Sequence, residues 1–263
     1  MQTKSTILVL SLTALLGTAA AQDFLDPCFG LPTHGELKAQ LTRIARSFQG
    51  NGGLGFPMWA TVVNRDGVVC AVTFSGSGRG DQWPGSRLIS AQKANTANAF
   101  SLPLFALSTA NLYAATLPNG TLFGLQESNP INQAVAYGGK PEDFGRVDDP
   151  MAGKRIGGIN VFGGGLALYS PGGQLIGGLG VSGDTSCADH IIAWKLRYAI
   201  NLDNVPAGPN GTARDNIIHD IPTGVQVPGQ SASGFGHPKC SEAATDIARD
   251  LAINYPPGPY PPQ

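Results

Sequence analysis

The most constraining feature of this chain is a block of glycines and large apolar residues between Gly153 and Gly183. The block places twelve glycines among Ile, Leu, Val, Phe and Tyr, in the run GKRIGGINVFGGGLALYSPGGQLIGGLGVSGD. Glycine weakens a strand, so it is concentrated where a backbone bends, bulges or comes close to another group. We therefore expect strands that press closely against neighbouring elements here, and we expect this block to line the functional site.

Within the block, the residues from Gly178 to Gly183 spell G-x-G-x-x-G, the fingerprint of dinucleotide-binding folds. That fingerprint belongs in the first strand-to-helix turn of a parallel sheet, with further βαβ units after it. Here it follows a hairpin turn at Pro171-Gly-Gly173, late in the chain. Asp203 stands at about the right distance for a ribose-binding acid, but no strand pattern precedes it. The context therefore argues against a nicotinamide cofactor.

Ser182 lies in Gly180-Val-Ser-Gly-Asp184, one residue short of the G-x-S-x-G nucleophile elbow of serine hydrolases. Such enzymes also need a mostly parallel sheet and a histidine late in the chain. His219 and His237 are late, but they lie in irregular, Pro-rich sequence. The favoured alternative is that Ser182 or Asp184 caps the helix that follows, by satisfying its free N–H groups.

Hairpins, rather than crossover connections, dominate the predicted strands. Two pairs of short apolar runs flank turn sequences, namely Trp59–Val63 with Val68–Phe74 and Leu166–Ser170 with Gln174–Val181. Ile156–Val161 is a further candidate strand. Helical spacing predicts the helices Thr33–Phe48 (with a Thr33/Glu36 capping box), Arg87–Phe100, Leu102–Leu117, Cys187–Ile200 and Ser241–Ile253. This order predicts an α/β (α+β) fold, in which helices pack on an antiparallel sheet of about five strands.

The first residues have the pattern of an export signal. Lys4 precedes the apolar stretch Ile7–Leu16, and Ala19-Ala-Ala21 is an A-x-A cleavage site. The apolar stretch is shorter than the roughly 20 residues of a permanent anchor, the alternative interpretation. We expect a signal peptide at residues 1–21, a domain over 22–200, and a Pro/Gly-rich extension with one short helix over 201–263. The mature protein is then secreted or periplasmic, with no membrane contact.

Charge and cysteine content narrow the partners and the compartment. The net charge is −1 and no basic cluster is present, so we expect no nucleic-acid partner. Four cysteines in an exported chain predict disulfides, and four cysteines permit three pairings. We favour Cys28–Cys70 and Cys187–Cys240, because each bridge would tie a terminal extension to the core. No C-x-x-C spacing indicates a metal site.

Three segments, in this order, resemble the GlcG/HbpS-like heme-binding family, also called the haem-degrading domain or DUF336 family. They are the hairpin Trp59–Phe74, the helical run Ser90-Ala-Gln-Lys-Ala-Asn-Thr-Ala97, and Gly163–Leu166 with Ile176–Gly183 and then Asp189. The resemblance covers Thr33 to Tyr198. It implies a compact α/β sandwich with an antiparallel, profilin-like sheet, a heme or other tetrapyrrole ligand, and assembly into homo-oligomers.

The resemblance makes heme the expected cofactor. Heme needs an apolar slot, an axial ligand and cationic partners for its propionates. His190 and His34 are the candidate axial ligands. The simpler interpretation of His190 is a helix N-terminal histidine hydrogen-bonded to Asp184 or Asp189, and that of His34 is a surface or capping residue. The candidates for holding the propionates or lining the cleft are Arg79, Arg87, Lys93, Gly164 and Gly165.

Two other functions remain open at this point. The chain could be an enzyme acting on a small organic acid or aldehyde in the same cleft, with Asp189, His190 and Ser182 as acid–base groups. For Asp189, the simpler interpretation is an acidic residue that meets the dipole at a helix start. The third function is structural, in which the glycine block is the interface of an oligomer. The sequence does not decide whether any reaction is catalysed.

Overall fold

The structure is a computed structural model that describes residues 26–46, 50–222 and 231–260. The predicted signal peptide, residues 1–21, lies outside these ranges. Within them, no helix combines the length and the apolar character needed to cross a bilayer.

A four-stranded antiparallel sheet forms the centre of the fold. Its strands are β1 (Trp59–Asn64), β2 (Val69–Phe74), β3 (Gly165–Tyr169) and β4 (Leu175–Ser182), in the order β2-β1-β4-β3. Both predicted hairpins are present, and the inner strands β1 and β4 pair from Trp59 opposite Ser182 to Asn64 opposite Gly177. The antiparallel α/β prediction is therefore confirmed, with four strands instead of about five.

The missing strand is Ile156–Val161, and its prediction was wrong. Gly157 and Gly158 both have positive φ, 66° and 78°, which interrupts an extended ladder. Beyond them, backbone N–H groups donate to side chains instead of a strand: that of Asn160 to Thr96 Oγ1 at 3.0 Å, and that of Val161 to Gln126 Oε1 at 3.3 Å. An apolar run can therefore be buried and hydrogen-bonded without joining a sheet.

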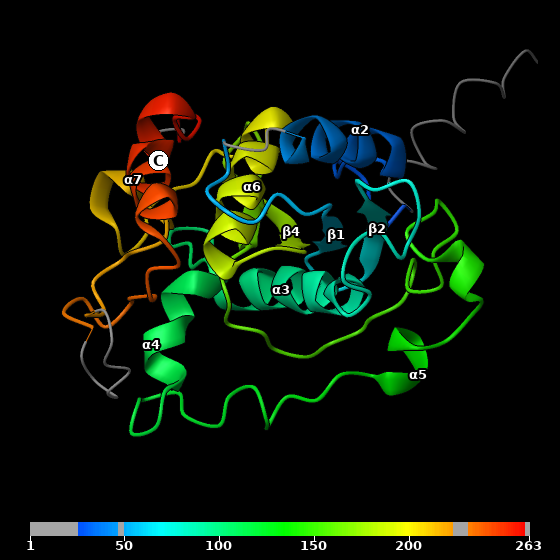
Figure 1. Ribbon diagram of the computed structural model, residues 1–263, viewed down its shortest axis with the longest axis horizontal. Coiled ribbons are helices and arrows are strands. Elements are labelled where there is room, and N and C mark those ends of the chain that lie inside the picture. Colours follow the sequence, from blue (N-terminus) through cyan, green and yellow to red (C-terminus); the bar gives the residue numbers. More distant parts are fainter. Residues whose placement is uncertain (1–25, 47–49, 223–230, 261–263) are drawn as a thin grey trace, which may run out of the picture.

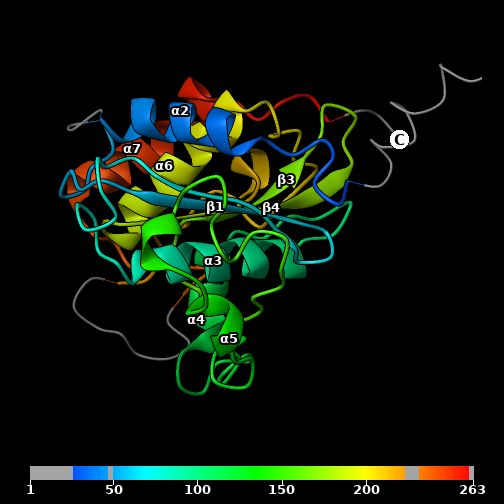
Figure 2. The same cartoon turned by 90° about the vertical axis from the view of Figure 1, so that its right-hand side faces the viewer.

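Helices cover both faces of the sheet (Figures 1 and 2). Helix α3 (Ser86–Phe100) lies on one face, and α2 (His34–Ala45) and α6 (Ser186–Ala199) lie on the other, with α7 (Glu242–Asn254) packed on α6. The predicted capping box is present, because Thr33 and Glu36 exchange hydrogen bonds at the start of α2. The core between the sheet and α2, α6 and α7 is built from residues such as Leu37, Leu179, Ile191 and Leu251.

The predicted helix Leu102–Leu117 is much shorter in the structure. Leu102 and Phe105 exchange backbone hydrogen bonds in a tight turn around Pro103, and helical structure begins only at η1 (Thr109–Leu112) and α4 (Tyr113–Thr116). Proline's missing N–H and fixed φ favour such a turn over a continuing helix. The remaining short helices are α5 (Gln133–Ala136), η2 (Pro141–Asp143) and η3 (Gly211–Ala213).

The glycine block brings α3 close to the sheet. A Cβ placed on Gly180 of β4 would collide with the carbonyl oxygen of Ser90 and lie 2.5 Å from the amide nitrogen of Ala94, both on the α3 backbone. A Cβ on Gly178 would collide with the carbonyl oxygen of Ala94. These glycines therefore permit a contact between helix and strand that any side chain would block, as the sequence predicts.

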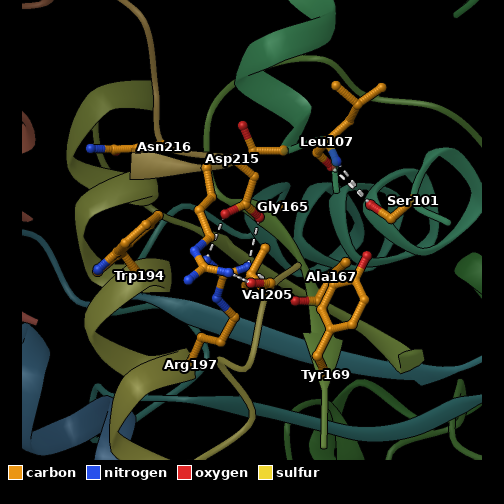
Figure 3. Close-up of polar contacts among 12 residues, drawn as sticks. Ser101, Leu107, Gly165, Ala167, Tyr169, Trp194, Arg197, Val205, Asp215 and Asn216 are labelled. Atoms are coloured by element: carbon orange, nitrogen blue, oxygen red, sulfur yellow. Dashed lines mark hydrogen bonds and ion pairs between the residues drawn. The ribbon is translucent and has the colours of Figure 1, made fainter. Parts of the chain in front are cut away.

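Two disulfides and a buried ion pair hold the outer segments to the core. The bridges are Cys28–Cys70 and Cys187–Cys240, with Cα–Cα distances of 5.5 and 6.0 Å, and this confirms the predicted pairing. Arg197 of α6, 1% exposed, binds both carboxylate oxygens of Asp215 at 2.6 and 2.8 Å (Figure 3). Helix α6 is thus bonded covalently and ionically to the residues that follow it.

Candidate functional site

Where the glycine block meets α3 and α6, the structure brings three of the predicted residues together. Lys93 Nζ lies 2.7 Å from Asp189 Oδ2 and donates to the carbonyl of Val181 at 3.1 Å. Lys93 is on α3 and Asp189 is on α6, so this ion pair joins the two helical layers at the end of the sheet. A Cβ on Gly164 would lie 3.0 Å from Asp189 Cβ and 3.2 Å from Lys93 Nζ. The glycine therefore leaves the space that the ion pair fills.

Burial opposes charge on both members of this pair. Loss of hydration raises the pKa of Asp189 to about 6, although Lys93 and the N–H of Asp184 work in the other direction. The same burial lowers the pKa of Lys93. Lys93 is 1% exposed and Asp189 2%, and each has hydrogen-bond partners within the fold. This geometry is that of an interior cross-link, and a catalytic role for Asp189 stays a prediction.

His190 is completely buried on α6 and faces the C-terminal residues. Its Nε2 lies 3.1 Å from Asn216 Oδ1 and 3.1 Å from the backbone nitrogen of Ile217. Its Nδ1 is buried with no hydrogen-bond partner among the described residues. Nε2 could ligate a metal only if residues 216–217 moved away from α6. Axial ligation by His190 is therefore a prediction that requires a rearrangement.

The residues predicted to cap α6, Ser182 or Asp184, do not cap it. Helix α6 is capped by Thr185, whose side chain accepts the N–H of Ala188. The Asp184 carboxylate instead accepts the N–H groups of residues 54–56 at 2.8 to 3.3 Å. These three residues precede β1 and lie outside the sheet. Ser182 is the last residue of β4, paired with Trp59 and 4% exposed. A hydrolytic role for Ser182 stays a prediction.

The buried histidines predict a pH dependence of stability. Burial lowers the pKa of His190 to about 3 and that of His237 to about 4, from 6.5. Below pH 6.5, both histidines stay neutral in the folded protein but take up protons in the unfolded chain. The stability that they contribute is therefore complete above pH 6.5 and is lost as the pH falls from 6.5 toward the folded pKa values. The raised pKa of Asp189 offsets part of this loss below pH 6. We expect a net loss on the order of several kcal/mol in urea unfolding free energy.

The matched variants are His190→Gln and His34→Gln. The first removes a buried titrating group, so its stability should fall less steeply with acid than that of the wild type. The second replaces a half-buried histidine whose Nε2 bonds the carbonyl of Gly145 at 2.9 Å. Equal slopes for both variants and the wild type would contradict a neutral, buried His190.

A separate pocket of about 380 Å³ opens beside α3, near the start of the helix. Its volume falls within the range of roughly 300–1,000 Å³ typical of small-molecule sites. The walls are apolar and aromatic, formed by Trp59, Pro84, Leu88, Ala136, Tyr137, Pro141 and Phe144, with Gly80, Gly85, Arg79 and Arg87 completing the lining. We call this the aromatic pocket.

Arg87 is a structural member of the aromatic pocket. Its guanidinium binds Asp149 through Nε at 2.8 Å and Nη2 at 2.5 Å, donates to the carbonyl of Ala136 at 3.0 Å, and stacks over the Phe144 ring at 3.8 Å. Asp149 also accepts the N–H of Gly145 at 2.7 Å. These contacts fix residues 136–149 against α3 and so hold one wall of the pocket in place.

Arg79 is the charged group of the pocket that remains free. It is exposed, and no hydrogen bond or ion pair joins it to any part of the chain that the structure describes. Its loop is held by Asp81, whose Oδ2 accepts the N–H groups of Ser77 and Gly78 at 2.7 and 2.8 Å. The arginine thus projects from an ordered loop at an apolar pocket.

Two more polar groups of the aromatic pocket lack partners in the described residues. Trp59 Nε1 is buried without a hydrogen bond, and the hydroxyl of Tyr137, a residue 69% exposed, makes none either. Sequence reasoning missed Tyr137, because it lies in a stretch with few regular signals. His34 is adjacent, bonded to Gly145, but it does not line the pocket. The predicted residues are therefore divided between two places, with only Arg79 and Arg87 at the pocket.

This architecture defines a small α/β protein with an apolar, aromatic pocket beside its antiparallel sheet. The sequence model of the family described as "Haem degrading protein HbpS-like" matches residues 39–196. The chain belongs to this family. Among curated proteins, no significant relative is found.

Three solved structures are similar to this chain. Klebsiella pneumoniae protein ORFY, of the DUF336 family, is 21% identical, with a TM-score of 0.44 over 74% of this chain and 97% of its own. PduOC, in a complex with heme, is 26% identical, with a TM-score of 0.42 over 62% and 91%. HbpS is 17% identical, with a TM-score of 0.37 over 63% and 86%.

Proposed function

We propose that this protein binds heme or a closely related tetrapyrrole in the aromatic pocket. The observation that carries the proposal is an apolar, aromatic pocket with an unpartnered arginine, in a chain of the HbpS-like family. A tetrapyrrole presents flat apolar faces and carboxylates at its edge. Aromatic walls suit the faces, and an arginine fork suits a carboxylate by paired, charge-assisted hydrogen bonds.

The residues present fit such a ligand. Trp59 and Phe144 supply ring surfaces, Arg79 would hold a propionate, and the phenol of Tyr137 offers an oxygen ligand of the kind that binds heme iron in some proteins. The buried, unpartnered Nε1 of Trp59 is a further hydrogen-bond donor. When bound, heme would supply iron-centred redox chemistry. The chain's own residues would hold the ring and exclude water from one of its faces.

Hemin titration, followed by the Soret band, tests the proposal. The wild type should bind saturably. Arg79→Gln should raise the Kd about tenfold, since a charge-assisted bond contributes roughly 1.5 kcal/mol. Tyr137→Phe should change the Soret position, because it removes the oxygen ligand.

The matched controls are Arg43→Gln and Tyr198→Phe, which alter an arginine and a tyrosine of α2 and α6 outside the pocket lining. Both should bind hemin as the wild type does. The pocket would be the wrong site if Arg79→Gln and Tyr137→Phe behaved like their controls. If His34→Ala or His190→Ala abolished the Soret band of bound hemin instead, the iron ligand would be that histidine and not Tyr137.

We further propose that the protein works outside the cytoplasm and assembles into a homo-oligomer. Two disulfides support the first point, because such bridges persist in oxidising compartments. The family resemblance is what supports the second. Mass measurement by light scattering, with and without hemin, tests assembly, and a monomer under both conditions would remove that part of the proposal.

A further inference from the structure

The Cys187–Cys240 bridge lies beside two histidines that the aromatic pocket does not involve. The sulfur of Cys187 and one ring nitrogen each of His219 and His237 lie within 4.8 Å of one another. Cys240 contributes its own sulfur, bonded to that of Cys187. Two sulfurs and two imidazoles, from α6 and from the segments before α7, thus meet at one point.

Both imidazoles are held in the form that binds metals. His237 Nδ1 donates to the carbonyl of Pro238 at 2.8 Å, which leaves Nε2 as an acceptor, 3.2 Å from Ser186 Oγ. His219 Nδ1 lies 3.4 Å from the carbonyl of His237, and its Nε2 is buried with no partner among the described residues. Burial lowers the pKa of both rings.

The bridge is also placed where a thiol reductant can open it. Cys240 is exposed and lines a surface pocket with Thr185 and Ser241, whereas Cys187 is fully buried, so an incoming thiolate approaches the bridge from the Cys240 side. Cys187 lies in the first turn of α6, and its N–H donates to Cys240 Sγ at 3.2 Å. The start of a helix favours negative charge, which makes Cys187 a good leaving thiolate.

We propose that Cys187, Cys240, His219 and His237 form a redox-controlled site for Zn²⁺ or a similar divalent cation. Two reductant thiols convert the bridge into two cysteine thiols and are themselves oxidised to a disulfide. The cation then binds both sulfurs, with release of two protons, and both imidazoles. This donor set, two cysteines and two histidines, is one that tetrahedral zinc prefers. With the bridge intact, the sulfurs are not thiolates and the site stays closed to the cation.

Such a site would preserve the attachment of the C-terminal residues. The bridge joins α6 to the segment that leads into α7, and the cation would join the same two segments when the bridge is open. In the residues that the structure describes, no comparable group of donors includes Cys28 or Cys70 of the other bridge. In the described residues, Cys187, His219 and His237 are the potential ligand side chains that lie close enough together to hold one metal ion.

Zinc titration of the full chain, with and without reduction by a non-chelating phosphine, tests this proposal. We expect about one equivalent of Zn²⁺ bound by the reduced protein, none by the oxidised protein, and a higher melting temperature for the reduced protein with zinc. Co²⁺ in place of Zn²⁺ should show a thiolate charge-transfer band. His219→Gln and His237→Gln should each weaken binding at least tenfold.

The matched control is the double variant Cys28→Ser/Cys70→Ser, which lacks the other bridge and should still bind Zn²⁺ when reduced. The proposal is overturned if the reduced wild type binds no zinc, whether folded or not. Equal binding by oxidised and reduced protein would overturn it too, as would full affinity in both histidine variants. Should a histidine variant fail to fold, the cobalt spectrum of the wild type decides, because a site without thiolates lacks the charge-transfer band.

Discussion

Replacement of Gly180 by alanine is expected to destabilise the protein by more than about 3 kcal/mol, or to prevent folding. Overpacking a core typically costs about 1–3 kcal/mol when side chains can move aside. Here the added Cβ would meet the backbone of Ser90 and Ala94 in α3. Relief then requires the whole helix to move away from β4. Urea unfolding followed by circular dichroism measures the loss.

Gly35→Ala is the matched control for this change. Gly35 lies in α2, and a Cβ there would meet nothing within 4 Å. Alanine is favoured over glycine inside a helix by roughly 0.5–1 kcal/mol, so this variant should gain stability. If Gly180→Ala unfolded at the same urea concentration as the wild type, the close contact between α3 and β4 would be disproved.

Asp215→Asn is expected to cost about 3–5 kcal/mol, because it leaves the buried Arg197 guanidinium without a counter-ion. Arg197 donates to both Asp215 oxygens and to the carbonyl of Ala167, and it lies over the Trp194 ring at 4.9 Å (Figure 3). Few groups could replace the lost charge, since the arginine is 1% exposed. Thermal and urea unfolding provide the measurement.

A double variant that removes both charges and a variant of an exposed ion pair serve as controls for Asp215→Asn. Arg197→Met combined with Asp215→Leu should recover much of the loss, since an apolar pair needs no charge compensation. Asp246→Asn, which breaks the exposed pair with Arg249, should change stability by less than about 1 kcal/mol. A small effect for Asp215→Asn, no larger than that of Asp246→Asn, would mean that water reaches Arg197 in solution.

The parts of the fold that were predicted correctly depend on neighbours in sequence. The two hairpins follow from turn residues between apolar runs, and the start of α2 follows from the Thr33/Glu36 capping box. Ile156–Val161 was predicted wrongly because its hydrogen-bond partners, Thr96 and Gln126, are distant in the chain. Local pattern gives no sign that such side chains will replace a neighbouring strand.

The same difference between local signals and distant contacts explains which residues of the candidate site were predicted. Arg79 was identified from a glycine-rich loop with basic residues, which is a local signal. Tyr137 and Phe144 were missed, because their approach to α3 depends on the pair Arg87–Asp149, whose members are 62 positions apart. The histidines beside the Cys187–Cys240 bridge, His219 and His237, were considered as partners of a serine nucleophile but were not connected with Cys187. Their proximity to Cys187 follows from the path of the C-terminal residues, which the sequence did not predict.

The bonds between α6 and the residues that follow it have a consequence for synthesis. A nascent chain leaves the ribosome N-terminus first, so α6 is complete before Asp215 and Tyr255 emerge. Until then, Arg197 has no counter-ion and the Trp194 indole N–H lacks its acceptor, the carbonyl of Tyr255 at 2.9 Å. The sheet and its helices therefore reach their final packing only after Tyr255 has been made. A chain that stops early carries exposed apolar surface that quality-control proteases can recognise.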